Sequence, residues 1–362
     1  MKLLVNAPIN ALSFGNVTIN ILRELYKKNV DLVFFPIGDK AELDAYDKIN
    51  MDFIKYLQKA TNERFFKIHK NIPSLKIWHI LGSENRCTKN QSLFTFHEVS
   101  EVTNSEKNLL NLQDQIFVTS NYTKNIFELN GVKNVTYVPL GFDPDFHETN
   151  KTYLEEKIHF GLIGKFENRK NTSRIIKTWL KLFGNNSQYQ LSCAITNPFI
   201  DSSRLQNEII KTLEGKQYNN INFIPYMKTN SEVNDFMNSI DIDLGGLSGG
   251  EGWNLPSFNA TALGKWSVVL NATAHKDWAT KDNSILIEPS SLKDCYDDIF
   301  FRKGQMFNQG QFFDISDAEM ENAISKSVSY AKKKNIEGLK LQKEFTYSKT
   351  VDALLSVIMS QV

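Results

Sequence analysis

The sequence predicts an α/β protein with two Rossmann-like domains, each built on a parallel sheet. Short apolar runs of strand length alternate with longer helical stretches, which is the pattern of parallel α/β sheets. The alternation stops at residues 140–153, a segment with Gly141, Pro144 and no clear periodicity, and then starts again. The chain has 362 residues, which suits about two domains at roughly 150 residues each.

In the first half, the apolar runs predict strands at 3–8, 30–36, 75–81, 93–97, 115–119 and 135–140. The longer stretches between them predict helices at 17–28, 43–66 and 122–130. Ser120 directly follows the strand at 115–119, where a helix N-cap is expected.

After the linker, strands are predicted at 158–163, 191–196, 221–225, 240–244, 267–271 and 284–287. Helices are predicted at 172–183, 203–214, 231–239 and 256–263. The two halves are therefore similar in architecture, and we expect a first domain at 1–148 and a second at 149–340.

Charge and composition exclude several classes of protein. There are 42 basic and 41 acidic side chains, a net charge of +1, whereas a protein held to nucleic acid through phosphates normally has a basic excess. The N-terminus lacks the apolar core of a signal peptide, and no apolar run approaches the ~18 residues that span a bilayer. The three cysteines form neither a disulfide framework nor a zinc ligand set. We expect a soluble, cytoplasmic protein.

The most informative segment is SGGEGWNLPSFNATALGK, at 248–265. Gly249, Gly250 and Gly252 follow a strand and precede a helix with Pro256 in its first turn. The free N–H groups of such a loop and the helix dipole favour phosphate. Glu251 would repel phosphate, so a role in accepting hydrogen bonds from sugar hydroxyls is one explanation. A simple helix cap is the alternative.

A second segment, GLIGKFENRKNTSRIIKTW at 161–179, has the same arrangement. Lys165, Arg169 and Lys170 follow the strand that ends in Gly164 and stand where the next helix begins. Cations at a helix N-terminus oppose the helix dipole by ~0.3–1 kcal/mol each. An anionic partner such as a diphosphate would compensate for this cost, and a solvated charged helix start is the alternative.

These two motifs, in this order, resemble the second domain of the large retaining family of GT-B glycosyltransferases. That family binds the donor diphosphate with a strand-Gly-Arg/Lys-x4-Lys motif and has an E-x7-E motif further along the chain. Lys165 and Lys170 match the two cations, and Glu251 matches the first glutamate. Residues 94–147 and 345–358 are similar to the family's run into the linker and to its last helix.

The resemblance implies a GT-B fold, in which residues 341–362 form a helix that crosses back to the first domain. It implies a UDP- or GDP-sugar as donor substrate, with no cofactor. Glu251 would orient the sugar, Lys170 would stabilise the diphosphate, and His97 would reach the donor from the first domain. The implied donor-binding residues are Gly15, Lys165, Arg169, Lys170, Gly250, Glu251, Gly252, Trp253, Asn254, Leu255 and Asn259.

One departure from the family pattern is Asn259, which stands where the family has its second glutamate. The resemblance implies that this position holds the ribose hydroxyls. Asn can still accept and donate hydrogen bonds, but as a neutral amide it would bind less strongly than a carboxylate.

In the first domain, Gly15 and Asn16 lie in a short loop after the first strand, and a plain tight turn is the alternative to a ligand-binding role. His97 and Glu98 end a strand at the carboxyl edge of the sheet, where α/β proteins bind ligands. A structural histidine is the alternative for His97. His275, after the strand at 267–271, is a further candidate.

Basic residues are concentrated at 55–89, in the predicted acceptor domain, and include Lys67 and Lys70. A solvated face is the usual explanation of such a run. Contact with an anionic acceptor or an anionic membrane surface is the alternative. We interpret Asp241 and Asp243 as structural and expect no metal, because Lys165 and Lys170 can neutralise a leaving diphosphate.

We therefore expect a retaining, metal-independent glycosyltransferase, specifically a hexosyltransferase, that acts on a glycan, lipid-linked or other hydroxyl acceptor. Three alternatives stay open: a non-catalytic subunit of the same fold that binds a glycan or a partner, a sugar-nucleotide epimerase, and a transferase whose acceptor is a modified base in nucleic acid.

Overall fold

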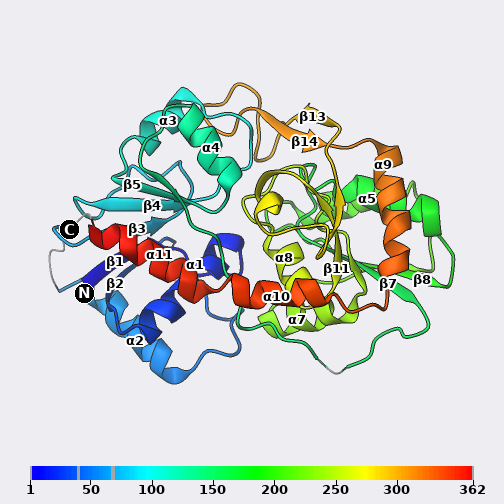
Figure 1. The fold of residues 1–362 in the computed structure, drawn as a ribbon, viewed down its shortest axis with the longest axis horizontal. Helices are drawn as coiled ribbons and strands as arrows, with labels where there is room; N and C mark the ends of the chain where they lie inside the picture. The colour runs from blue at the N-terminus through cyan, green and yellow to red at the C-terminus, as the bar shows by residue number, and fades with distance from the viewer. Residues whose placement is uncertain (1, 39–40, 67–69, 150, 361–362) are drawn as a thin grey trace.

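The computed structural model describes residues 2–38, 41–66, 70–149 and 151–360. Two six-stranded sheets, parallel throughout, form the frame of two domains that lie side by side (Figure 1). This arrangement confirms the predicted fold class. The strands of the first sheet, in spatial order, are β2 (Asp31–Pro36), β1 (Lys2–Ala7), β3 (Ser74–Ile77), β4 (Gln91–Thr95), β5 (Gln115–Val118) and β6 (Val135–Tyr137).

The second sheet repeats this design with a different strand order. Its strands are β12 (Ile285–Ile287), β11 (Trp266–Leu270), β10 (Ile242–Asp243), β7 (Ile158–Ile163), β8 (Tyr189–Ala194) and β9 (Ile221–Phe223). The central strands of both sheets are almost entirely buried, as expected where helices cover both faces of a parallel sheet.

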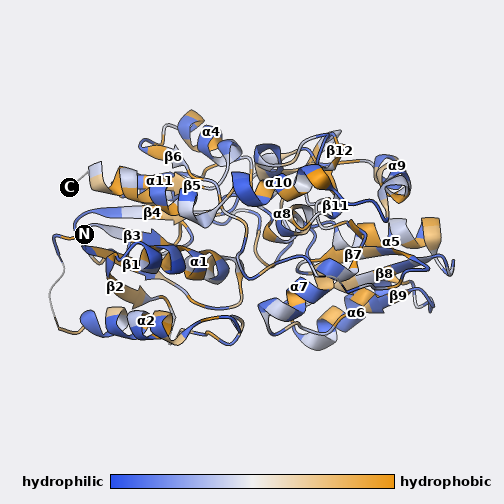
Figure 2. Ribbon diagram, turned by 60° about the horizontal axis from the view of Figure 1, so that its bottom comes forward, coloured by the Kyte–Doolittle hydropathy of each residue, from blue (hydrophilic) through white to orange (hydrophobic). Residues whose placement is uncertain are grey.

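Helices cover both sheets with their apolar sides inward. Figure 2 shows hydrophobic and hydrophilic residues alternating around surface helices such as α2 and α6. The helices of the first domain are α1 (Ser13–Lys27), α2 (Met51–Glu63), α3 (Asn104–Leu110) and α4 (Asn121–Leu129). Those that follow are α5 (Thr172–Phe183), α6 (Ser202–Thr212), α7 (Asn230–Ser239), α8 (Leu255–Ala262), α9 (Asp317–Ser327), α10 (Ile336–Glu344) and α11 (Tyr347–Ser360), with short 3₁₀ turns η1 (Thr273–Asp277) and η2 (Val328–Tyr330).

Two segments connect the domains. The linker after β6 runs into the second domain, and α10, which packs on α8, leads back through α11 onto α1 of the first domain (Figure 1). The two connections touch, because Phe142 N donates to Phe345 O over 2.9 Å and Thr350 Oγ1 donates to Pro139 O over 2.7 Å.

The main differences from the predicted elements have local causes. The helix predicted at 43–66 begins only at Met51, because the Asn50 side chain caps it by accepting from Phe53 N. The short helix α3, which begins with a capping box of Thr103 and Glu106, was not predicted. Nor was the antiparallel pair β13 (Ser291–Asp294) and β14 (Gln311–Asp314).

Within the described ranges, no helix is both long and apolar enough to cross a bilayer.

Candidate active site

A cleft of about 880 Å³ lies between the two domains at the carboxyl ends of their strands. The first domain contributes an apolar wall that includes Phe14, Trp78 and Phe96. The second domain contributes the charged groups, among them Lys165, Lys170 and Glu251. This is where open α/β sheets bind ligands, and the volume lies in the range of small-molecule sites, roughly 300–1,000 Å³.

The predicted cations lie in the loop between β7 and α5. Gly164 ends β7 with φ +149°, and a Cβ there would lie 3.3 Å from the side chain of Lys170. The absence of a side chain at Gly164 therefore lets Lys170 lie along the backbone and reach the cleft. The ammonium nitrogen of Lys170 is 2.6 Å from Glu251 Oε1, and the Lys170 side chain is 13% exposed.

Arg169 lines the cleft, and its guanidinium already pairs with two carboxylates. Its side chain is 8% exposed, and its guanidinium pairs with Glu167 Oε2 at 3.1 Å and Glu251 Oε2 at 3.0 Å. It also donates to Gly250 O. Through these contacts, Arg169 holds the loop at 249–252 and keeps Glu251 ionised.

Glu251 is 5% exposed and has a cation on each carboxylate oxygen. Burial alone would raise the pKa of Glu251, but Arg169 and Lys170 outweigh burial and hold that pKa far below its ordinary value. Glu251 is therefore ionised at any pH near neutrality. A buried carboxylate in this state accepts strongly from hydroxyl groups that enter the cleft.

The third predicted cation, Lys165, lies at the outer side of the same loop. Its ammonium is 3.0 Å from Glu167 Oε1 and stands over the rings of Phe199 and Phe300, at 5.0 and 5.1 Å from their centroids. These aromatic faces favour a cation at this position.

The glycines of the 248–252 loop have a packing role between the domains. A Cβ at Gly250 would lie 2.7 Å from Glu98 O, and one at Gly252 would lie 2.8 Å from Cβ of Phe96. Thr119 Oγ1 donates to Gly252 O over 2.5 Å. The loop thus approaches the end of β4 so closely that larger residues would push the domains apart.

The start of α8 is held by buried polar contacts. Asn254, at φ +65°, donates from Nδ2 to Gly245 O and to His275 Nε2, each over 3.0 Å. His275 Nδ1 donates to Leu270 O over 2.8 Å, and burial lowers the pKa of His275 to about 4. His275 is therefore neutral and supports the loop.

Trp253 is 3% exposed and packs on Phe258, while the partly buried Leu255 lines the cleft.

His97 borders the cleft, but its ring faces the first domain. Its Nε2 lies 2.9 Å from Glu101 O, and the ring contacts Phe127 edge-on with centroids 5.2 Å apart. Burial lowers the pKa of His97. Glu98 beside it lines the cleft, as does Asn16, whereas Gly15 packs on Asn10 behind the α1 turn.

A residue that sequence reasoning missed is His79, which follows β3 and lines the cleft. Its ring packs on Phe14 at 4.6 Å and on Trp78 at 5.1 Å between centroids. Burial lowers the pKa of His79, and Lys165 acts in the same direction. The strand was predicted over 75–81, which put His79 inside it, whereas β3 ends at Ile77 and so places His79 at the carboxyl edge of the sheet.

Residues 78–82 of the stretch at 55–89 line the cleft, but among the described residues none of its lysine or arginine side chains does. Lys76 is buried and donates to Asn85 O over 2.8 Å, and Arg86 pairs with Asp114. Lys70 is exposed outside the cleft, and Lys67 lies outside the described residues. Contact with an anionic acceptor or surface stays a prediction.

Asn259 lies on α8, 3% exposed, at the floor of the cleft. Its Oδ1 is 3.4 Å from the backbone nitrogen of Asp143 in the linker. Burial, reinforced by Asp145, raises the pKa of Asp143 to about 6. The family pattern has a glutamate at the position of Asn259. In this protein the carboxylate of Asp143, whose pKa is already raised, lies beside that position.

Asn259→Glu should therefore lower the free energy of unfolding relative to Asn259→Gln. Two like charges about 5 Å apart at an effective dielectric of about 20 repel by roughly 3 kcal/mol, so we expect a loss of about 1–3 kcal/mol at pH 8. The loss should shrink at pH 5, where Asp143 is protonated. Urea unfolding at both pH values measures it, and equal stability of the two variants at pH 8 would contradict the arrangement.

The structure is similar to solved glycosyltransferase structures, although no protein-family model and no curated protein sequence matches the chain. Sucrose-phosphate synthase from Thermosynechococcus elongatus aligns over 100% of this chain and 99% of its own, with a TM-score of 0.69 and 11% identity. HepE from Anabaena, solved with UDP-glucose, aligns over 99% and 100%, with a TM-score of 0.66 and 11% identity. An Escherichia coli trehalose-6-phosphate protein bound to UDP-2-fluoro glucose aligns over 99% of each chain, with a TM-score of 0.63 and 10% identity.

These likenesses cover the whole chain and both domains. Together with the two parallel sheets and the cleft between them, they show that the chain has the GT-B fold.

Proposed function

We propose that this protein is a glycosyltransferase that moves a sugar from a UDP- or GDP-sugar to a hydroxyl acceptor, with retention at the anomeric carbon and without a metal. The observation that carries the proposal is the buried Glu251 held between Arg169 and Lys170 at the mouth of a two-domain cleft. Structures of the same fold that contain UDP-glucose or UDP-2-fluoro glucose support it. A cytoplasmic location belongs to the same proposal.

The charged loop suits the breaking of a sugar–phosphate bond. As the C1–O bond breaks, the departing diphosphate keeps the electron pair, and the ammonium groups of Lys170 and Lys165 stabilise its charge. The acceptor oxygen bonds to C1 on the same face and passes its proton to the departing phosphate. Glu251 fixes the sugar by accepting from its hydroxyls, and we assign the ribose hydroxyls to Asn259.

The first-domain wall favours a sugar ring or another weakly polar group as the acceptor. Phe14 stacks on Phe96 with centroids 4.5 Å apart, and Trp78 and His79 extend the aromatic surface. The described lysine and arginine side chains of the stretch at 55–89 do not line the cleft. We therefore place a glycan or lipid-linked glycan acceptor on this wall.

A nucleotide-sugar screen tests the proposal. Donor binding raises the melting temperature, since a ligand stabilises by RT ln(1 + [L]/Kd). At least one UDP- or GDP-sugar should raise the melting temperature of the wild-type protein. The wild type should slowly hydrolyse that sugar nucleotide, and Glu251→Gln should not. Stabilisation without hydrolysis would indicate a non-catalytic subunit, and conversion of the donor to an epimer would indicate an epimerase.

Turnover should be unchanged in excess EDTA. Among the described residues, no group of three or more His, Cys, Asp or Glu side chains could hold a metal ion, and Asp241 and Asp243 lie apart, one paired with Lys332 and the other fully buried. Hydrolysis or transfer assays with and without chelator measure this. Loss of activity that Mn²⁺ or Mg²⁺ restores would refute the metal-independent mechanism.

A further inference from the structure

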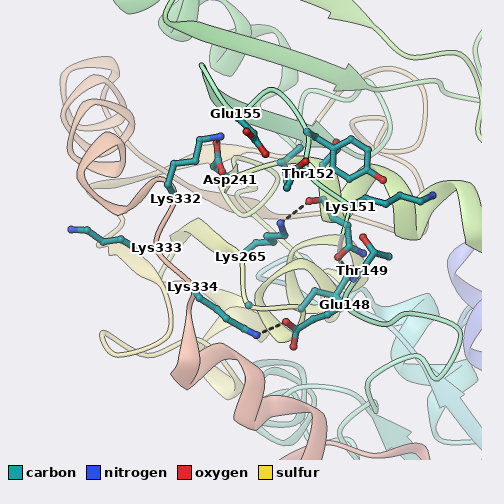
Figure 3. Close-up of a pocket in the computed structure, with 16 residues that line it drawn as sticks. Glu148, Thr149, Lys151, Thr152, Glu155, Asp241, Lys265, Lys332, Lys333 and Lys334 are labelled. Carbon is teal, nitrogen blue, oxygen red and sulfur yellow. Dashed lines mark hydrogen bonds and ion pairs between the residues drawn. The ribbon is translucent and has the colours of Figure 1, made fainter.

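A second cavity, of about 350 Å³, lies on the opposite side of the second domain from the active-site cleft. It is formed by linker residues 148–149 and 151–155, by the turns that lead into β10 and β11, and by the segment at 332–334 before α10 (Figure 3). These are the amino ends of the strands, whereas the cleft lies at their carboxyl ends. The cavity is therefore separate from the donor site.

The lining of the cavity is predominantly basic. Lys332 pairs with Asp241 at 3.0 Å and Lys334 pairs with Glu148 at 2.5 Å. The lysines and acids that line it are Lys151, Lys265, Lys332, Lys333, Lys334, Glu148, Glu155 and Asp241. Lys151 pairs with Asp235 outside the lining at 3.1 Å, which leaves four lysines against three carboxylates.

Lys265 is the cation at the centre of the cavity (Figure 3). Its ammonium donates to Asn238 O over 2.7 Å and forms no ion pair with a carboxylate of the described residues. Burial lowers the pKa of Lys265, and Lys332 and Lys334 act in the same direction against Asp241 and Glu148. An ammonium with two free N–H groups in this position would be stabilised by an incoming anion.

Two hydroxyl groups in the wall provide an independent indication of a ligand. Thr149 Oγ1 and the Tyr153 hydroxyl are both buried, and within the described chain neither makes a hydrogen bond. Both residues line the cavity. Buried polar atoms without partners are rare, because each costs about 1–3 kcal/mol. If these hydroxyls turn toward a polar ligand in the cavity, hydrogen bonds to it would remove that cost.

We propose that this cavity binds a phosphate monoester of a small polyol, such as a hexose phosphate. The dianionic phosphate would accept from Lys265 and Lys332. Thr149, Tyr153 and Glu155 would bind the hydroxyl groups. The volume lies at the lower end of small-molecule sites, roughly 300–1,000 Å³, which suits a single phosphorylated sugar.

The ligand would touch both connections between the domains. Glu148 belongs to the linker and Lys334 to the segment that leads into α10, and their ion pair already joins the two. Lys332 Nζ also donates to Leu154 O over 3.2 Å. A bound phosphate would therefore order both segments together, and this proposal does not depend on the chemistry of the cleft.

Isothermal titration with glucose 6-phosphate and with inorganic phosphate tests the site. We expect saturable binding of glucose 6-phosphate to the wild type, and a Kd at least tenfold higher for Lys265→Met and several-fold higher for Thr149→Val. The matched control Lys326→Met removes an exposed lysine at the end of α9 and should leave the Kd unchanged. Lys170→Met should also leave it unchanged, because that residue lies in the other cleft.

Hydrogen exchange locates the binding. Exchange at 151–155 and 332–334 should slow when glucose 6-phosphate is added to the wild type and should not slow in Lys265→Met. The proposal is overturned if the wild type shows no saturable binding, if Lys265→Met and Lys326→Met bind equally well, or if Lys170→Met abolishes binding. Thr149→Val keeps the test valid should Lys265→Met fail to fold.

Discussion

Lys170→Met should reduce the rate of sugar transfer by about 100- to 1,000-fold, the usual cost of removing one group that stabilises developing negative charge. Lys170 Nζ gives one hydrogen bond to Glu251 at 2.6 Å and keeps two donors for the diphosphate. It is also partly exposed in the cleft. Its loss should therefore weaken UDP or GDP binding while leaving the affinity for the free nucleoside unchanged, because the nucleoside has no phosphate to contact.

The matched control is Lys177→Met, which removes an exposed lysine from α5, the helix that follows Lys170, and should leave turnover unaltered. Kd values for nucleoside and nucleoside diphosphate, together with kcat for the donor found in the screen, separate a phosphate contact from a folding defect. If Lys170→Met binds UDP and GDP as the wild type does, Lys170 serves only as the partner of Glu251. The diphosphate would then be assigned to Lys165.

The sequence predicts elements best where one segment has a strong period of its own. The strand at 158–163 and the helix at 172–183 were predicted with the bounds that the structure has, because one is a continuous apolar run and the other buries a single side through Ile175, Ile176 and Trp179. The pair β13 and β14 was missed because β13, SLKD, is mostly exposed and takes its conformation from its partner strand.

The site shows the same division between local and tertiary information. Glycine loops and cations before helices are local patterns, so Lys170 and Glu251 could be identified although they are far apart in the sequence. The structure brings them into contact. By contrast, the ring of His97 turns to Glu101 O, and His79 enters the cleft among Phe14 and Trp78. These orientations depend on packing between elements, which no local pattern contains.

Arg169→Met should cost about 3–5 kcal/mol of unfolding free energy at pH 7, as expected when one partner of a buried ion-pair network is removed. Arg169 is the only one of the three loop cations that contacts both Glu167 and Glu251, as judged over the described chain. Without it, two buried carboxylates keep only one lysine each among the described residues, and Gly250 O keeps only the 3.4 Å hydrogen bond from Ser248 Oγ. The free energy of unfolding of Arg169→Lys should lie between those of the wild type and Arg169→Met, because an ammonium cannot reproduce the guanidinium fork.

The pH dependence of this loss identifies its cause. In the wild type the pKa of Glu251 lies far below its ordinary value, so its ionised form stabilises the fold above the unfolded pKa of about 4.3, and this contribution disappears as the pH falls below that value. Arg169→Met raises the pKa of Glu251 in the folded state. The unfolded state is common to both proteins, so the stability difference should be largest at pH 7 and should narrow as the pH falls from the folded-state pKa of Glu251 in the variant toward the lower one in the wild type. Adding Glu251→Gln to Arg169→Met should recover part of the loss at pH 7, since the uncompensated charge is then gone. Urea unfolding across this pH range measures all three proteins, and a difference that stays constant with pH would assign the loss to packing of the Arg169 side chain instead of to its charge.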